Sequence, residues 1–259
     1  VLGTRAGSVS LWLVAGAAEP RRLLSGLERL AVAPDGKRIA WRTATSLYVG
    51  TVAQGELATV GETPATDDGV PVGFVGTGIL VAARTGGRYD VWWPDGGAYA
   101  PKWRSTASGV YGALPDGRTL VAQVPGASPS RPCLALLDAR AELALRKRAC
   151  DVPLNPGAVG WLSPDGRWLV AEGAVDAAVL VDLTDAFGDR RPAVEAGPGP
   201  YGPAVWVDAR TVVHAGPGRQ LVCLHLDRLA AGQQGGIERI EVPDAATAEP
   251  ILVVTQLAA

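Results

Sequence analysis

The feature that most constrains this chain is a nine-residue pattern that occurs three times. Each copy has a small or apolar residue, then Pro-Asp-Gly, a basic residue and an apolar run, and the copies lie at 33–41, 114–122 and 163–171. Proline presets a turn, aspartate accepts hydrogen bonds from nearby backbone N–H groups, and glycine adopts positive φ at little cost. The apolar run favours a buried strand. Each copy therefore predicts a tight turn that leads into a β-strand.

Weaker copies of this pattern extend it into a repeat along most of the chain. The first bulky apolar residues after the turns lie 40 to 49 residues apart, at Ile39, Leu80, Leu120, Leu169 and Val212. In the second and fifth copies, Gly-Thr-Gly (76–78) and Asp-Ala-Arg (208–210) replace the Pro-Asp-Gly turn. A repeat of about 40–45 residues with four short strands is typical of propeller blades. We therefore predict an all-β chain that forms one β-propeller.

The repeat predicts six four-stranded blades in a single domain spanning 1–259, with five or seven blades as alternatives. Five blades are continuous in sequence, at about 27–62, 69–104, 108–152, 157–197 and 202–243. We expect the sixth to be shared, with three strands from 1–26 and one from 247–259, because this pairing would satisfy the sheet edges at both ends of the chain. Two segments are also compatible with short helical pieces, Leu134–Arg148 and Asp227–Gln234.

Composition limits the classes of partner. The chain has 24 basic and 26 acidic residues, and it lacks the clustered basic stripe that nucleic-acid binding requires, so no nucleic-acid partner is expected. No run of about 18 apolar residues occurs, so no membrane-spanning segment is expected. Because the chain has no Met, we expect residues before Val1 to be missing, and an upstream signal peptide or membrane anchor could have stood there.

The turn-strand copies resemble the Pro-Asp-Gly repeats of TolB-like, WD40-like β-propellers, and Arg88–Trp93 is similar to the third strand of that repeat. The resemblance implies the propeller fold. Several such propellers are exported or membrane-anchored scaffolds that bind protein partners, and the resemblance implies such a role here. Because the chain shows no catalytic constellation, we expect a non-enzymatic bacterial module that binds a protein or peptide, and we expect it to be a monomer. The resemblance assigns no activity, because propellers host many functions. No hydrolase domain follows the repeats, and the turns lack the extra residue of sialidase Asp boxes, so neither enzyme class is expected.

The Pro-Asp-Gly aspartates are predicted to be structural. Asx-type hydrogen bonds would close the turns, with glycine at the position of positive φ. The aspartates would also lie on different blades, which suits no paired-carboxylate mechanism. The residues assigned this turn role are Asp35, Gly36, Asp116, Gly117, Asp165 and Gly166.

Two of the three cysteines are predicted to form a disulfide. If 133–138 and 143–150 form an antiparallel hairpin, Cys133 and Cys150 oppose each other at its open end, where their Cβ atoms would be close enough to bridge. Two reduced cysteines are the alternative. A disulfide would indicate an extracytoplasmic compartment. The third cysteine, Cys223, lies in an apolar run and is predicted to be a small buried hydrophobe.

The sequence shows no catalytic constellation. Neither His214 nor His225 has the spacing of a zinc motif, so no metal site and no cofactor are expected. Binding residues are expected on the loops opposite the Pro-Asp-Gly turns, because loops on a rigid scaffold often carry function. The candidates are Asp67, Asp68, Trp103, Arg131 and Tyr201. The alternative function is a propeller enzyme of lyase or lactonase type, with its active site at the channel mouth.

Overall fold

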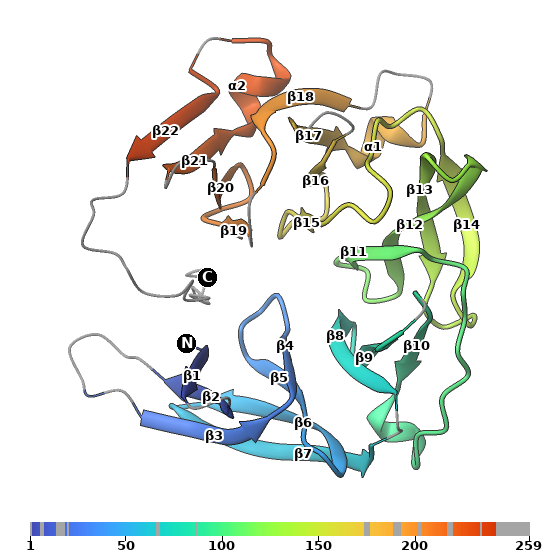
Figure 1. Ribbon diagram of the computed structural model, residues 1–259, viewed down its shortest axis with the longest axis vertical. Helices are drawn as coiled ribbons and strands as arrows, with labels where there is room; N and C mark the ends of the chain where they lie inside the picture. Colours follow the sequence, from blue (N-terminus) through green and yellow to red (C-terminus); the bar gives the residue numbers. More distant parts are fainter. Residues whose placement is uncertain are drawn as a thin grey trace. The chain divides into compact units, whose positions relative to one another are not determined.

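A computed structural model describes residues 2–5, 8–13, 19, 21–65, 68–85, 87–173, 177–188, 193–200, 204–216, 220–233 and 235–241. In these residues the chain is all-β, with six antiparallel sheets and only short helical pieces (Figure 1). One sheet falls within each predicted blade, whereas the six-blade count stays a prediction. The described residues divide into two compact units, unit 1 up to Arg104 and unit 2 from Ser105 to Glu241. This division falls between the second and third predicted blades.

Unit 1 contains three sheets. The first has the order β1-β2-β3, from strands β1 (Leu2–Arg5), β2 (Ser8–Leu13) and β3 (Arg21–Leu27). The second has four consecutive strands, β4 (Arg29–Val32), β5 (Arg38–Arg42), β6 (Ser46–Ala53) and β7 (Glu56–Pro64). The third contains β8 (Gly69–Val75), β9 (Gly78–Ala83) and β10 (Tyr89–Trp92). The segment expected to complete the first sheet, within 247–259, lies outside the described residues.

The prediction of four strands in the second blade, at 69–104, is wrong: its described residues form three, with no outer strand at 98–103. A 3₁₀ helix, Pro94–Gly96, follows β10, and irregular backbone then runs to Arg104. Only one bridge meets the sheet edge, where the backbone N–H and C=O groups of Tyr89 and Arg104 pair at 2.8 Å. The physical reason is local, because Pro94 and Pro101 lack the N–H that a strand ladder needs.

Unit 2 contains three four-stranded sheets. The first is β11 (Gly109–Ala113), β12 (Thr119–Ser128), β13 (Arg131–Asp138) and β14 (Ala144–Ala149). The second is β15 (Gly160–Leu162), β16 (Trp168–Glu172), β17 (Ala177–Asp182) and β18 (Ala193–Pro198). The third is β19 (Ala204–Trp206), β20 (Thr211–Ala215), β21 (Gln220–His225) and β22 (Ile237–Glu241).

Two short helices follow third strands of unit 2. They are α1 (Leu183–Ala186) and α2 (Leu226–Ala230), and α2 overlaps the helical turn expected at Asp227–Gln234. The alternative helix in Leu134–Arg148 does not form, because the apolar run in β13 is buried on both faces of its sheet, with Leu134, Ala135 and Leu137 fully inaccessible. A run of apolar residues that are all buried is typical of a strand whose two faces are both covered.

The core of unit 2 lies between successive sheets. Val121 and Leu134 pack in one cluster with Leu169 and Val181 of the next sheet. The alternate positions Val170 and Leu180 pack instead against the third sheet, with Val222 and Leu224 among others. Because neighbouring residues of a strand point to opposite faces, the second sheet of unit 2 is buried on both sides.

The structure places the turn residues in one repeated geometry. The Asp35, Asp116 and Asp165 carboxylates each accept a hydrogen bond from the backbone N–H two residues later, at 2.9–3.0 Å. The glycines that follow them have positive φ, at Gly36, Gly117 and Gly166. These aspartates therefore hold turns in three different sheets.

Candidate functional site

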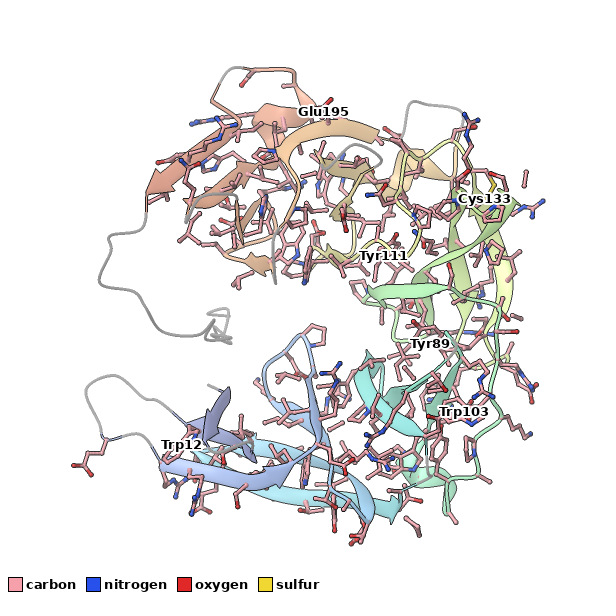
Figure 2. The ribbon with its side chains drawn as sticks, in the orientation of Figure 1. Trp12, Tyr89, Trp103, Tyr111, Cys133 and Glu195 are labelled. Carbon is pink, nitrogen blue, oxygen red and sulfur yellow. A yellow bond between two sulfur atoms is a disulfide. The ribbon has the colours of Figure 1, made fainter. Side chains whose placement is uncertain are left out.

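Two of the predicted binding residues of unit 1 meet at a third residue that sequence reasoning did not single out. The Arg88 guanidinium lies 3.2 Å from a carboxylate oxygen of Asp68. Its central carbon also lies 6.0 Å from the ring centroid of Trp103, which is a cation–π distance. We call Asp68, Arg88 and Trp103 the Arg88 cluster. Figure 2 labels Trp103 and, next to Arg88 in sequence, Tyr89.

The backbone around the Arg88 cluster is held by the third sheet. Asp68 directly precedes β8, and its C=O accepts from the N–H of Arg84 at 2.8 Å, while the C=O of Arg88 accepts from Ala83 at 2.8 Å. Trp103 is half-buried and packs against the apolar cluster that includes Phe74 and Trp92. The indole therefore has an apolar support on one side, and the partly exposed Arg88 side chain lies over the ring.

Glu28, Arg42 and Arg84 form a second group of paired charges in unit 1. They lie at the strand ends on the same side of the sheets as the Arg88 cluster. Glu28 precedes β4 and accepts from Arg42 at 2.8 Å and also from Arg84. The hydrogen bond from Arg42 lowers the pKa of Glu28, against the opposing effect of desolvation. Arg42 also donates to the C=O of Gly69 at the start of β8. These contacts tie the end of the second sheet to the edge of the third.

The other predicted binding residues do not join the Arg88 cluster. Asp67 and Tyr201 lie outside the described residues. Arg131 is exposed and begins β13 in unit 2. The expectation that Arg131 lies on a loop is wrong, because β12 and β13 continue through most of 125–132 and Ser128 pairs with Arg131.

A buried polar network occupies part of the predicted loop face of unit 2. Gln123 is fully inaccessible and donates to the Tyr111 hydroxyl at 3.1 Å and to the C=O of Asn155 at 2.7 Å. Its side-chain oxygen accepts from the N–H of Gly157 at 2.7 Å. Burial raises the pKa of Tyr111. Because Gln123 uses its polar groups to fasten a loop to β12, this network is structural.

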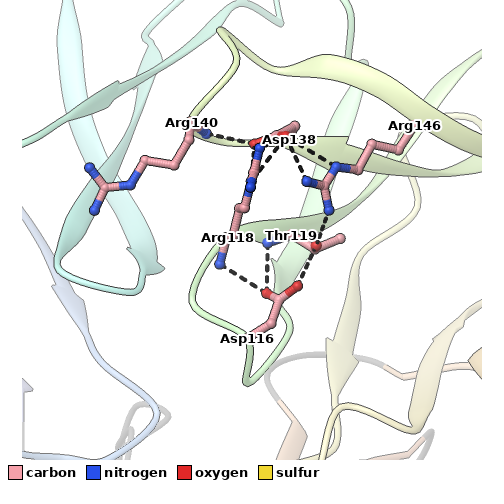
Figure 3. A network of polar contacts seen from close by, with 6 residues as sticks. All are labelled: Asp116, Arg118, Thr119, Asp138, Arg140 and Arg146. Carbon is pink, nitrogen blue, oxygen red and sulfur yellow. Dashed lines mark hydrogen bonds and ion pairs between the residues drawn. The ribbon is translucent and has the colours of Figure 1, made fainter.

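The densest charge network in unit 2 surrounds Asp138 at the end of β13 (Figure 3). Its carboxylate accepts from Arg118 at 2.6 Å, from Arg146 at 2.7 Å and from the backbone N–H of Arg140 at 2.9 Å. The Arg118 hydrogen bond is the largest reason that the pKa of Asp138 lies well below its usual range. A carboxylate engaged by two guanidinium groups is a poor acid or base.

The same pairing recurs one sheet later. Arg167 donates to Asp182 at 2.8 Å. Arg118 and Arg167 each directly follow the Asp-Gly of their own turn. The register also matches, because Ala139 donates its N–H to the C=O of Arg118, and Leu183 donates to that of Arg167. The Arg–Asp pairs therefore belong to the repeat unit, in which each joins the turn after the first strand to the end of the third strand.

The structure joins Cys133 to Cys150 in a disulfide, as the hairpin register predicts. Cys223 is the remaining thiol, and it is buried. It lies close to two further side chains that could bind a metal, His225 and Glu238. Burial raises the pKa of Cys223, as do the charges of Glu238 and Asp208. The spacing of these residues matches no zinc motif, although Cys-x-His on a strand does place two ligands on one face.

Within the described part of the chain, none of the helices has both the length and the apolar character needed to cross a membrane.

Comparisons with known proteins identify the fold. TolB from Acinetobacter baumannii aligns with 85% of this chain at 17% identity and a TM-score of 0.56, and the alignment spans 57% of that TolB chain. Kuenenia stuttgartiensis hydrazine synthase aligns with 89% of this chain and 74% of its own, at 15% identity and a TM-score of 0.53. Kluyveromyces lactis Hsv2 aligns with 78% and 61%, at 12% identity and a TM-score of 0.54.

No protein-family model matches the chain, and no curated protein matches it in sequence. At these low identities the likeness shows the fold alone. The chain has a TolB-like β-propeller fold, and its chemistry must be argued from its own residues.

Proposed function

We propose that this chain is a non-enzymatic β-propeller module that binds a protein or peptide through the Arg88 cluster. The observation that carries the proposal is the partly exposed guanidinium held between the Asp68 carboxylate and the Trp103 ring. Arginine and tryptophan are enriched among the residues that contribute most to binding at protein interfaces. The two contacts also restrain Arg88 before binding, which reduces the side-chain entropy lost when a partner binds.

The cluster favours a particular class of ligand. The contact with Asp68 engages one terminal nitrogen of Arg88, whereas a guanidinium has five N–H donors. A carboxylate can accept two of these donors side by side. The half-buried Trp103 ring offers apolar surface beside them. We therefore propose an extended peptide segment that presents a carboxylate next to an apolar side chain.

The proposed compartment is extracytoplasmic, as an exported or membrane-anchored module. The disulfide between Cys133 and Cys150 supports this compartment, because disulfides persist in oxidising environments and are rare in the bacterial cytosol.

A peptide selection tests the proposed function. Phage carrying random peptides are selected on the immobilised chain, and the synthetic peptides are titrated against the chain in solution. We expect enrichment of acidic residues beside apolar ones. The substitutions Arg88→Ala and Trp103→Ala should each weaken binding about tenfold or more, as expected for interface residues of this kind.

The matched control removes another Arg–Trp contact of unit 1. The Arg22 guanidinium carbon lies 5.9 Å from the Trp12 ring centroid. Because Arg22 does not belong to the Arg88 cluster, Arg22→Ala should leave the peptide affinity unchanged. Near-ultraviolet circular dichroism would verify that each variant is folded. Selected peptides that bind the wild type and Arg88→Ala equally well would refute recognition by the Arg88 cluster.

A further inference from the structure

We propose that Cys223, His225 and Glu238 form a binding site for a zinc ion on the third sheet of unit 2. This site is separate from the proposed peptide recognition, which uses residues of unit 1. The three residues are the group of potential metal ligands that the described structure brings together.

The strands place all three side chains on one face. Cys223 and His225 are two positions apart on β21, so they project from the same side. Glu238 on β22 pairs directly with Cys223 across the ladder. The intervening residue, Leu224, points the other way and packs in the apolar core with Val222. The buried opposite face therefore fixes the orientation of the ligands.

The distances between ligand atoms are close to those of a tetrahedral zinc site. Cys223 Sγ lies 3.8 Å from His225 Nε2, which in turn lies 3.7 Å from Glu238 Oε2. All three atoms lie within 4.8 Å of one another. Zinc–ligand bonds of about 2.0–2.3 Å at tetrahedral angles require separations of about 3.4–3.6 Å between ligand atoms. Small side-chain rotations would be enough to close the site around an ion.

Burial and charge also suit a metal ion. The thiol of Cys223 is buried, whereas the side chain of Glu238 is 61% exposed and that of His225 is 33% exposed, so an ion can enter from solvent. Asp208 adds a second negative charge near Cys223. Three protein ligands leave one tetrahedral position for water, which is the arrangement of an open zinc site.

The donor set selects the class of metal. One sulfur, one imidazole nitrogen and one carboxylate oxygen are all accepted ligands of zinc. Calcium and magnesium prefer oxygen ligands alone, so a thiol and an imidazole disfavour them. Without a metal, the same residues would form only a weak thiol–imidazole contact and a pairing of the imidazole with Glu238. The experiment must distinguish these two states.

Cobalt(II) is the probe for this experiment, because it occupies zinc sites and absorbs in the near ultraviolet when a thiolate is bound. The full chain is used without reductant, with one free thiol verified by thiol titration so that the disulfide is intact. We expect one cobalt ion per chain, a thiolate-to-cobalt absorption band, and loss of that band when one equivalent of zinc is added. Competition with zinc then gives the zinc affinity.

Variants identify the ligands. Cys223→Ser should abolish the absorption band, and His225→Gln and Glu238→Gln should each weaken cobalt binding at least tenfold. Glu195→Gln is the matched control, because Glu195 is an exposed carboxylate on the outer strand β18 of the neighbouring sheet, and it should leave the titration unchanged. Far-ultraviolet circular dichroism verifies that the variants fold. A chain with one free thiol that shows no band, or a band that persists in Cys223→Ser, would overturn the proposal.

Discussion

At the scale of single residues, Asp138 is the clearest case of a charge that stabilises the fold. Its side chain is almost inaccessible, yet it carries two guanidinium partners and a backbone donor. The repeated Arg167–Asp182 pair shows that the contact belongs to the architecture of the sheet. Such a carboxylate stabilises the protein only while it is ionised.

The Asp138 network predicts a specific dependence of stability on pH. Because the Arg118 hydrogen bond lowers the pKa of Asp138 in the folded state, its contribution to stability is complete at pH values well above the unfolded pKa of about 3.9. As the pH falls below about 5 the unfolded chain takes up the proton first, so the contribution is progressively lost. Asp138→Asn should therefore be clearly less stable than the wild type at pH 7, and the difference should shrink by pH 3. Urea unfolding midpoints at both pH values measure it.

The exposed residue Asp151 provides the control for this experiment. Asp151→Asn should leave the urea midpoint near that of the wild type at both pH values. A deficit of Asp138→Asn that stays the same from pH 7 to pH 3 would show that the loss comes from packing and not from ionisation.

At the scale of elements, the Pro-Asp-Gly turns of unit 2 also make contact between successive sheets. A Cβ placed on Gly166 would lie 2.4 Å from Cδ of Pro115, which belongs to the turn of the preceding sheet. The proline ring is rigid and cannot move aside easily. The turns at Pro115 and Gly166 therefore have a packing role in addition to their role in reversing the chain.

A pair of glycine substitutions tests this packing role. Gly166 and Gly157 both have φ of 71°, but a Cβ on Gly157 would meet no atom within 4 Å. Gly157→Ala should cost about 1–2 kcal/mol of unfolding free energy for the left-handed backbone alone. Gly166→Ala should cost at least about 1 kcal/mol more, from overpacking against the proline. Guanidinium unfolding of both variants measures the difference, and equal costs would contradict a tight contact between the turns.

At the scale of the whole molecule, the disulfide connects the fold to the proposed compartment. It closes the hairpin of β13 and β14 in unit 2 at its open end. The two cysteines are separated by 17 positions in the sequence. Closing a loop of this length substantially lowers the conformational entropy of the unfolded chain. A protein that depends on this bond should be less stable wherever the bond cannot form.

The disulfide predicts that stability depends on the compartment of expression. Chain directed to an oxidising periplasm should have one free thiol after denaturation, whereas chain made in a reducing cytosol should have three. The oxidised form should be more stable by about 3 kcal/mol, as estimated for a loop of about 15 residues. Cys133→Ser/Cys150→Ser should have the same low stability from either source. Equal stability of the oxidised and reduced wild type would argue against a role for the bond in an extracytoplasmic protein.

Most of the strands and turns could be predicted from the sequence, because both depend on local physical chemistry. Pro-Asp-Gly specifies a turn within a few residues, and an apolar run after it specifies a buried strand. The hairpin register that pairs Leu134 with Ala149, and so brings Cys133 to Cys150, also follows from sequence alone. The wrong prediction of an outer strand in the second blade also has a local cause, because the prolines near 98–103 prevent a regular strand there.

Which distant side chains meet could be learned only from the three-dimensional structure. Asp68, Arg88 and Trp103 come from three separate segments, and their meeting depends on how the third sheet of unit 1 positions its ends. Cys223 and Glu238 face each other because the connection through α2 returns β22 in one particular register. Side-chain contacts between separate segments depend on loop paths and sheet register, for which a single sequence carries no local signal. For this reason the architecture could be predicted from the repeat, whereas the two proposed sites required the structure.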